Sequence, residues 1–193
     1  WDAIFEPQEY KVGMINDATE ALTLGTFYLY GPRSEISRDQ AKRVTTLLKS
    51  QHAWVEAYGF RGDYLVATHN SPVAVSTSSS YFPTHAFFPA MRFTIPKPWT
   101  LASIESMAVA ASSEKADLAY DFINYLYTPK NQAAMTDFFH YFPATTPSIP
   151  YITRSPEFLE LLRALSEGDT TFYFFTHLIP EPEICEMWID VKS

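Results

Sequence analysis

Short runs of β-forming residues alternate with longer stretches of helical periodicity, and this alternation most restricts the fold of the chain. The apolar residues 12–15 are followed by Asp17, a natural N-cap, with Glu20 at the spacing of a capping box. Ser37 and Ser155 precede two further helical stretches in the same way. Because no half of the chain holds strands alone, the pattern predicts the α/β class.

The helical stretches place apolar residues on one face, as in Ala116, Ala119 and Ile123. In the last predicted helix the same spacing directs Leu159, Leu162 and Leu165 inward. The predicted helices run from Asp17 to near Gly31, from Ser37 to near His52, over residues 116–127, over residues 129–139, and from Pro156 to Gly168.

Further strands are predicted where β-forming residues cluster between turn signals. Residues 106–111 are almost wholly apolar, which is typical of a strand buried on both faces of a parallel sheet. Glu105 directly precedes this run, so its carboxylate needs a partner or a water-filled cleft. The other predicted strands are residues 64–68, 73–76 and 92–95, and the aromatic residues 172–175 are expected in a core or on a partner surface.

Charge and composition exclude several classes of partner. The 193 residues are 47% hydrophobic, which indicates a folded chain, and their formal net charge is −8. An acidic chain repels phosphate backbones and attracts cations, so no nucleic-acid partner is predicted. The single cysteine, Cys185, cannot form a disulfide within the chain.

Hydroxyl and histidine residues do not form a recognisable catalytic pattern. A nucleophilic serine needs a strained, usually glycine-flanked turn, and the serine-rich residues 76–80 contain no glycine. The five histidines lack the spacing of a metal pair, and the six glycines form no phosphate-binding pattern. The sequence thus predicts no catalytic residue, no metal and no nucleotide cofactor. A hydrolase that uses Ser78 or Ser79 with a nearby histidine is the enzyme alternative.

Three carboxylates at the ends of predicted strands are the candidate binding groups: Asp17, Glu20 and Glu105. In an open α/β sheet, ligands bind outside the carboxyl ends of the strands. Capping alone also explains Asp17 and Glu20, so a structural role is the competing interpretation.

An ordered set of segments from residue 1 to about residue 147 resembles a known family. The segments are residues 1–7 (WDAIFEP), 14–21 (MINDATEA), 62–67 (GDYLVA), 95–97 (IPK), 105–109 (ESMAV) and 119–126 (AYDFINYL). In order and spacing they resemble the periplasmic solute-binding proteins of ABC transporters, in particular the spermidine/putrescine-binding branch. Beyond residue 150 the likeness fades.

The resemblance implies periplasmic-binding-protein-like α/β lobes, each a mixed sheet flanked by helices. Two such lobes are joined by a hinge, with the ligand clamped between them. Residues 1–98 then match the second lobe, residues 99–147 return to the first lobe, and residues 148–193 pass back to the second. Most of the first lobe is absent from this chain, which the resemblance presents as a fragment.

The resemblance also implies the site and the function. Asp17, Glu20 and Glu105 match acids that face ligand ammonium groups, and Tyr141 matches a pocket tyrosine. Asn70 and Ser103 stand where polyamine binders have tryptophans and are expected to line the cleft. Trp99, which is close by in the sequence, is a candidate replacement for one wall. The implied function is substrate binding, without enzymatic activity, for an ABC importer of polyamines or a related small cationic solute. It implies a membrane permease as partner and a periplasmic or lipid-anchored extracellular location. The alternative is a ligand-sensing or interaction module that keeps the fold without transport.

Overall fold

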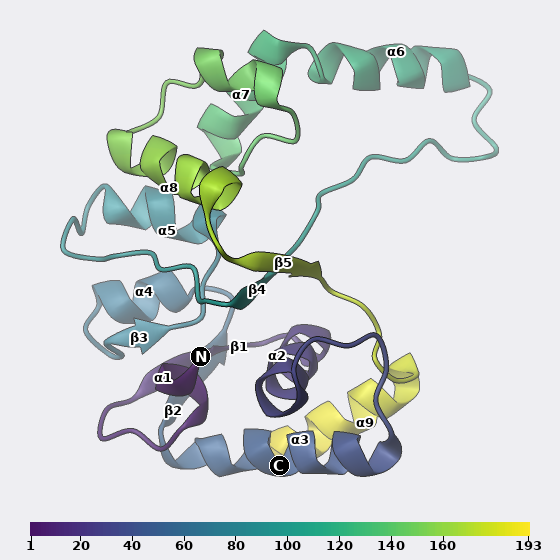
Figure 1. The fold of residues 1–193 in the computed structure, drawn as a ribbon. Helices are drawn as coiled ribbons and strands as arrows, with labels where there is room; N and C mark the ends of the chain where they lie inside the picture. Colours follow the sequence, from purple (N-terminus) through teal and green to yellow (C-terminus); the bar gives the residue numbers. More distant parts are fainter. The chain divides into compact units, whose positions relative to one another are not determined.

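The computed structural model describes residues 1–193, except for the side chain of Ser166, and the chain divides into two compact units (Figure 1). Unit 1 comprises residues 1–103 and 170–193, and unit 2 comprises residues 104–169. The predicted α/β class is confirmed, because strands and helices alternate through most of unit 1. The assignment of residues 1–98, 99–147 and 148–193 to two lobes stays a prediction.

A three-stranded parallel sheet forms the centre of unit 1. Its order is β2 (Val55–Gly59), β1 (Val12–Ile15) and β3 (Val73–Ala74), and all four residues of the middle strand are buried. Because the three strands are parallel, their carboxyl ends lie at the same edge of the sheet. That edge is where a ligand site is expected.

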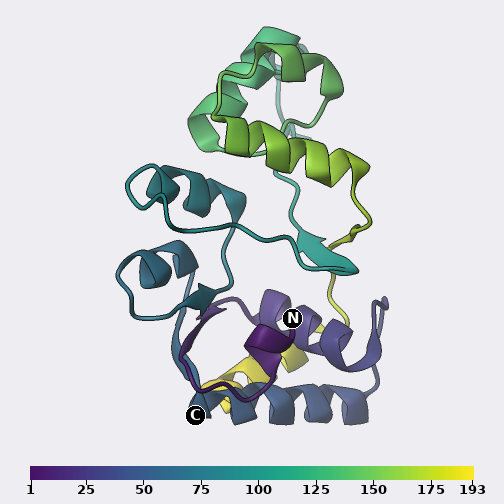
Figure 2. The same cartoon turned by 60° about the vertical axis from the view of Figure 1, so that its left-hand side comes forward.

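Three helices pack together around the core of unit 1: α2 (Ala18–Tyr30), α3 (Arg38–Ser50) and α9 (Glu181–Lys192). Figures 1 and 2 show α3 and α9 side by side. The first two helices and their caps are confirmed, because Asp17 and Ser37 both accept hydrogen bonds from the first turn. The α9 helix lies in a stretch for which no helix was predicted. Short helices α1 (Asp2–Phe5) and η1 (Gln51–Ala53) complete this part of the unit.

The predicted strand at residues 64–68 is wrong, since this segment belongs to helix α4 (Gly62–Ala67). Asp63 and Ala67 are buried four residues apart while Tyr64 is exposed, which is a helical pattern. Gly62 permits the helix to approach β3, because a Cβ there would lie 2.1 Å from the carbonyl oxygen of Val75. Helix α5 (Ser78–His85) was likewise not predicted.

The predicted strand at residues 92–95 is also wrong, because these residues form neither strand nor helix. Phe93 packs instead against Tyr81 of α5, with ring centroids 5.2 Å apart. The strand forms a few residues later, where β4 (Trp99–Ala102) pairs in parallel with β5 (Thr171–Phe174).

Trp99 is part of the core of unit 1. Its ring is 9% exposed, stacks on Trp1 at 5.4 Å and meets the Phe27 ring edge-on. The expectation that Trp99 supplies a binding wall is therefore wrong. Tyr173 of β5 also meets Phe27 edge-on, as the core interpretation of the aromatic cluster requires, while Phe174 is exposed.

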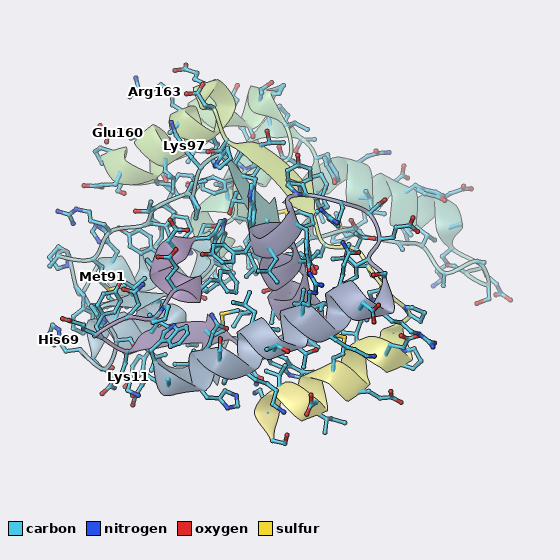
Figure 3. All side chains as sticks on the ribbon, turned by 60° about the horizontal axis from the view of Figure 1, so that its bottom comes forward. Lys11, His69, Met91, Lys97, Glu160 and Arg163 are labelled. Carbon is cyan, nitrogen blue, oxygen red and sulfur yellow. The ribbon has the colours of Figure 1, made fainter. Side chains whose placement is uncertain are left out.

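Unit 2 is helical, with α6 (Ala116–Leu126), α7 (Pro129–Phe139), η2 (Thr146–Tyr151) and α8 (Pro156–Glu167). The three predicted α-helices are confirmed. Its core includes Phe158, which is fully buried and packs against Phe142. Leu159, which was expected inward, is 38% exposed, since the neighbouring Phe158 takes the inward position. The side chains of Glu160 and Arg163, labelled in Figure 3, are exposed on α8.

The buried strand predicted at residues 106–111 is wrong. These residues form no strand, and all are exposed except the half-buried Val109. Apolar composition alone cannot create a strand without a neighbouring strand to pair with, and none lies beside this segment among the described residues.

Each helix of the described residues is too short or too polar to cross a bilayer.

Candidate functional site

Asp17 and Glu20 lie together at the carboxyl end of β1. The strand ends at Ile15, and α2 begins at Ala18 with Asp17 as its N-cap. The Asp17 Oδ1 atom accepts a hydrogen bond from the Glu20 backbone N–H at 2.8 Å. Both residues are half-buried, so the first turn of α2 holds two carboxylates beside the sheet.

The ionisation of Glu20 is perturbed by this position. Its pKa is raised from 4.5 to about 7, first by burial and second by the negative charge of Asp17. A cation placed beside the pair favours the ionised carboxylate, so its binding displaces the proton held at neutral pH. A positive ligand would therefore relieve the repulsion that the two carboxylates create.

Glu20 should make the stability of the chain depend on pH. Between about pH 4.5 and 7 the native chain holds a proton that the unfolded chain has lost, so the free energy of unfolding falls as the pH rises. In the Glu20→Gln variant, the free energy of unfolding should no longer decrease over this pH range. Urea denaturation from about pH 5 to 8 measures it. The exposed Glu56→Gln serves as the control and should keep the wild-type profile. A wild-type profile in Glu20→Gln would contradict the assignment.

Asn70 lies in the turn between α4 and β3, which is the turn that leads into the amino end of β3. Its side-chain amide donates to the Thr68 hydroxyl at 2.9 Å, and the preceding His69 is in the left-handed conformation (φ 61°). Figure 3 shows His69 at the periphery of unit 1. The chain path thus separates Asn70 from the carboxyl edge, and its role in binding stays a prediction.

Ser76 is a polar residue at the carboxyl edge that sequence reasoning did not assign to the site. It follows β3 closely, as Asp17 follows β1. Its Oγ atom is buried and has no hydrogen-bond partner among the described atoms. Asp17 was identified because it is a polar residue that follows a short apolar run. Ser76 follows the apolar residues 73–75 in the same way.

An ammonium group is already bound beside Asn16, the residue that precedes Asp17. The Lys192 Nζ atom donates to Asn16 Oδ1 at 2.5 Å and lies 4.7 Å from the centre of the Tyr58 ring and 5.0 Å from that of Trp188. Two aromatic faces and an amide oxygen are the groups that hold alkylammonium ions in proteins. This end of the sheet therefore contains chemistry suited to amines.

The remaining predicted residues lie at separate places in the two units. Ser103 is exposed directly after β4 in unit 1. In unit 2, Glu105 is exposed in the segment before α6, so its charge does not enter a buried strand. Tyr141 follows the end of α7 and is 41% exposed. The structure brings together Asp17 and Glu20, and the roles of the other predicted residues stay predictions.

A surface groove in unit 1 carries no comparable chemistry. A groove of about 560 Å³ between α3 and α9 contains ion pairs that join Arg38 to Glu183 and Lys49 to Asp190, so these charges neutralise one another. Among the described side chains, no three histidine, cysteine, aspartate or glutamate residues gather to hold a metal ion.

Solved structures of other proteins share the fold of this chain. Two solved structures align with essentially the whole chain: a Listeria monocytogenes protein assigned as a spermidine/putrescine ABC transporter, and PotD, the substrate-binding protein of a spermidine/putrescine ABC transporter from Streptococcus pneumoniae. Their TM-scores are 0.74 and 0.72 at 19% and 16% identity, and each alignment covers 100% of this chain and 61% of the neighbour. At this identity the likeness establishes a shared fold.

Sequence comparison then gives the family. Residues 1–159 match the model of the bacterial extracellular solute-binding proteins, and the chain belongs to this family. The putrescine-binding periplasmic protein PotF of Escherichia coli strain K12 is 30% identical over 105 residues, which is 52% of this chain and 28% of PotF. The family predicted from the ordered segments is thereby confirmed. The chain spans about three-fifths of the length of the structural neighbours and matches about a quarter of PotF.

Proposed function

We propose that the chain is part of the substrate-binding component of an ABC importer and that its solute is a polyamine or a related small alkylammonium ion. The observation that carries the proposal is the half-buried pair Asp17 and Glu20 at the carboxyl end of β1. Burial and the nearby charge of Asp17 raise the pKa of Glu20, and a positive partner such as an ammonium group would favour the ionised form of its carboxylate.

The wider properties of the chain support the same ligand class. The net charge of −8 attracts cations, and the ammonium group of Lys192 contacts the Tyr58 ring and the amide oxygen of Asn16, the residue before Asp17. The polyamine ligands in the names of PotF and PotD also agree with it.

The proposed partner is a membrane permease, and the proposed location is the periplasm or the outer face of the cell. Both come from the family, whose members are extracellular solute-binding proteins. No catalytic role is proposed for the serine run, because Ser78, Ser79 and Ser80 form the first turn of α5 and Thr77 caps it.

A thermal-stability panel tests the ligand class. Putrescine and spermidine should raise the melting temperature of the chain, and added salt should reduce this effect because it screens the charges. Butylamine, with one ammonium group, should stabilise less than putrescine. Stabilisation by a neutral sugar with none by the amines would overturn the proposal.

A further inference from the structure

We propose that Lys192 is a positioning residue for the solute site, because it holds in place the segment between β1 and α2 that carries Asp17. The inference rests on the proposed function and assigns a role to the last residue of α9, a helix that was not predicted from the sequence. The groups that hold its ammonium group are Asn16, Tyr58 and Trp188, and all of them belong to unit 1.

Two aromatic rings fix the ammonium group of Lys192. The Nζ atom lies 4.7 Å from the centre of the Tyr58 ring and 5.0 Å from that of Trp188, and the two rings meet edge-on at 5.5 Å. Both rings are partly buried against the core of unit 1, so they are fixed parts of the fold. Because ring faces attract a cation and apolar surface holds a lysine stem, this flexible side chain is kept in one position.

The third contact of the ammonium group joins α9 to the candidate site. Its Nζ atom donates to Asn16 Oδ1 at 2.5 Å, across 176 positions of the sequence. Asn16 lies between Ile15, where β1 ends, and Asp17, the N-cap of α2. Adjacent Cα atoms are about 3.8 Å apart, so holding Asn16 restricts where the Asp17 carboxylate can lie.

The position of Asp17 matters for affinity. Its Oδ1 atom accepts from the Glu20 N–H at 2.8 Å, so movement of Asp17 also disturbs the first turn of α2. A segment that moves freely must be ordered when a ligand binds, and this ordering weakens binding. The hydrogen bond from Lys192 orders the segment beforehand, so it contributes to affinity without contact with the solute.

The charge of Lys192 gives the inference a definite sign. A positive charge beside a cation site repels the ligand, so its removal would strengthen amine binding if only electrostatics mattered. Loss of the hydrogen bond to Asn16 has the opposite effect. We expect the loss of positioning to dominate, because Lys192 is exposed and its charge is screened by solvent and salt.

Calorimetric titration with putrescine above about pH 8 measures the role of Lys192. Lys192→Met keeps the unbranched stem and removes the ammonium group, and it should weaken binding about fivefold. Lys192→Arg keeps a cation that stacks on rings and donates hydrogen bonds, so it should restore most of the affinity. The matched control is Lys49→Met, which removes the same charge from a lysine that joins α3 to Asp190 of α9 at 2.7 Å. It should change the affinity less than about twofold.

Amide hydrogen exchange gives a readout that needs no ligand. The Glu20 N–H, which donates to Asp17, should exchange about fivefold faster in Lys192→Met than in the wild type. The Gln40 N–H donates to Ser37 in the same way at the start of α3, so it serves as the internal reference and should not change.

The inference is overturned if Lys192→Met binds putrescine as tightly as the wild type or more tightly. It is also overturned if exchange at Glu20 is unchanged, or if Glu20 and Gln40 accelerate equally, because equal acceleration reports a general loss of stability. If the wild type binds no amine while exchange at Glu20 alone accelerates in the variant, the proposed function fails and Lys192 orders a segment that has no ligand.

Discussion

The double variant Asp17→Asn/Glu20→Gln should bind putrescine at least about 100-fold more weakly than the wild type at a pH above 8. Each hydrogen bond between a carboxylate and an ammonium group contributes about 1.5–3 kcal/mol, and the variant removes two charged acceptors. A pH above 8 is needed because the pKa of Glu20 is about 7, so its carboxylate is mostly ionised there. Calorimetric titration measures the difference.

The substitutions are chosen to leave the fold intact. Asparagine is as good an N-cap as aspartate, so Asp17→Asn keeps the hydrogen bond to the Glu20 N–H, and glutamine matches the shape of glutamate. A control double variant, Asp39→Asn/Glu56→Gln, removes the same charge from exposed positions of unit 1. If the control loses as much affinity, the effect is one of net charge, and the site assignment is wrong.

The Asp63→Ala variant should lower the free energy of unfolding by about 3 kcal/mol, which is the largest effect on stability that we expect. Asp63 is 2% exposed and accepts hydrogen bonds from Arg61 at 2.7 Å and from the Thr84 hydroxyl at 2.6 Å. These bonds join the start of α4 to α5, so their loss leaves a buried hydroxyl without its acceptor.

The pH dependence of this effect has a definite sign. Burial opposes ionisation of Asp63, but the hydrogen bonds from Arg61 and Thr84 and the positive charge of Arg61 lower its pKa below 3.8. The stabilisation is therefore present above about pH 3.8 and is lost as the pH falls through the lower native pKa. Denaturation of Asp63→Ala and wild type should converge in acid. The exposed Asp39→Ala should stay within about 0.5 kcal/mol of the wild type.

Local signals predicted the helices α2, α3, α6, α7 and α8, but α4, α5 and α9 were missed. Asp17, Ser37 and Ser155 each cap the helix that follows them, and Pro129 begins α7 as a proline at the first helical turn should. Such signals lie within a few residues of one another, so the sequence displays them directly. Strand β1 was predicted for the same reason, because Val12–Ile15 is a short apolar run before a cap.

The errors came from contacts between distant residues. The strand predicted around Tyr64 became a helix because buried Asp63 bonds to Thr84 and Gly62 fits against β3, and neither contact is visible locally. Residues 106–111 have the composition of a buried strand but no neighbouring strand among the described residues.

The same difference between local and distant contacts applies to the candidate site. Asp17 and Glu20 were found because one helical turn joins them, whereas Ser76 reaches the same edge only through the pairing of β3 with β1.

The most direct test of the account is a calorimetric titration of the wild-type chain with putrescine and with 1,4-butanediol, its neutral isostere, above about pH 8 and again near pH 6. We expect binding of the diamine alone, weaker near pH 6 by up to about tenfold because protonation of Glu20 lowers the competent fraction. Equal binding of the diol and the diamine, or no binding of either, would contradict the proposal that the Asp17 and Glu20 pair receives an alkylammonium ion.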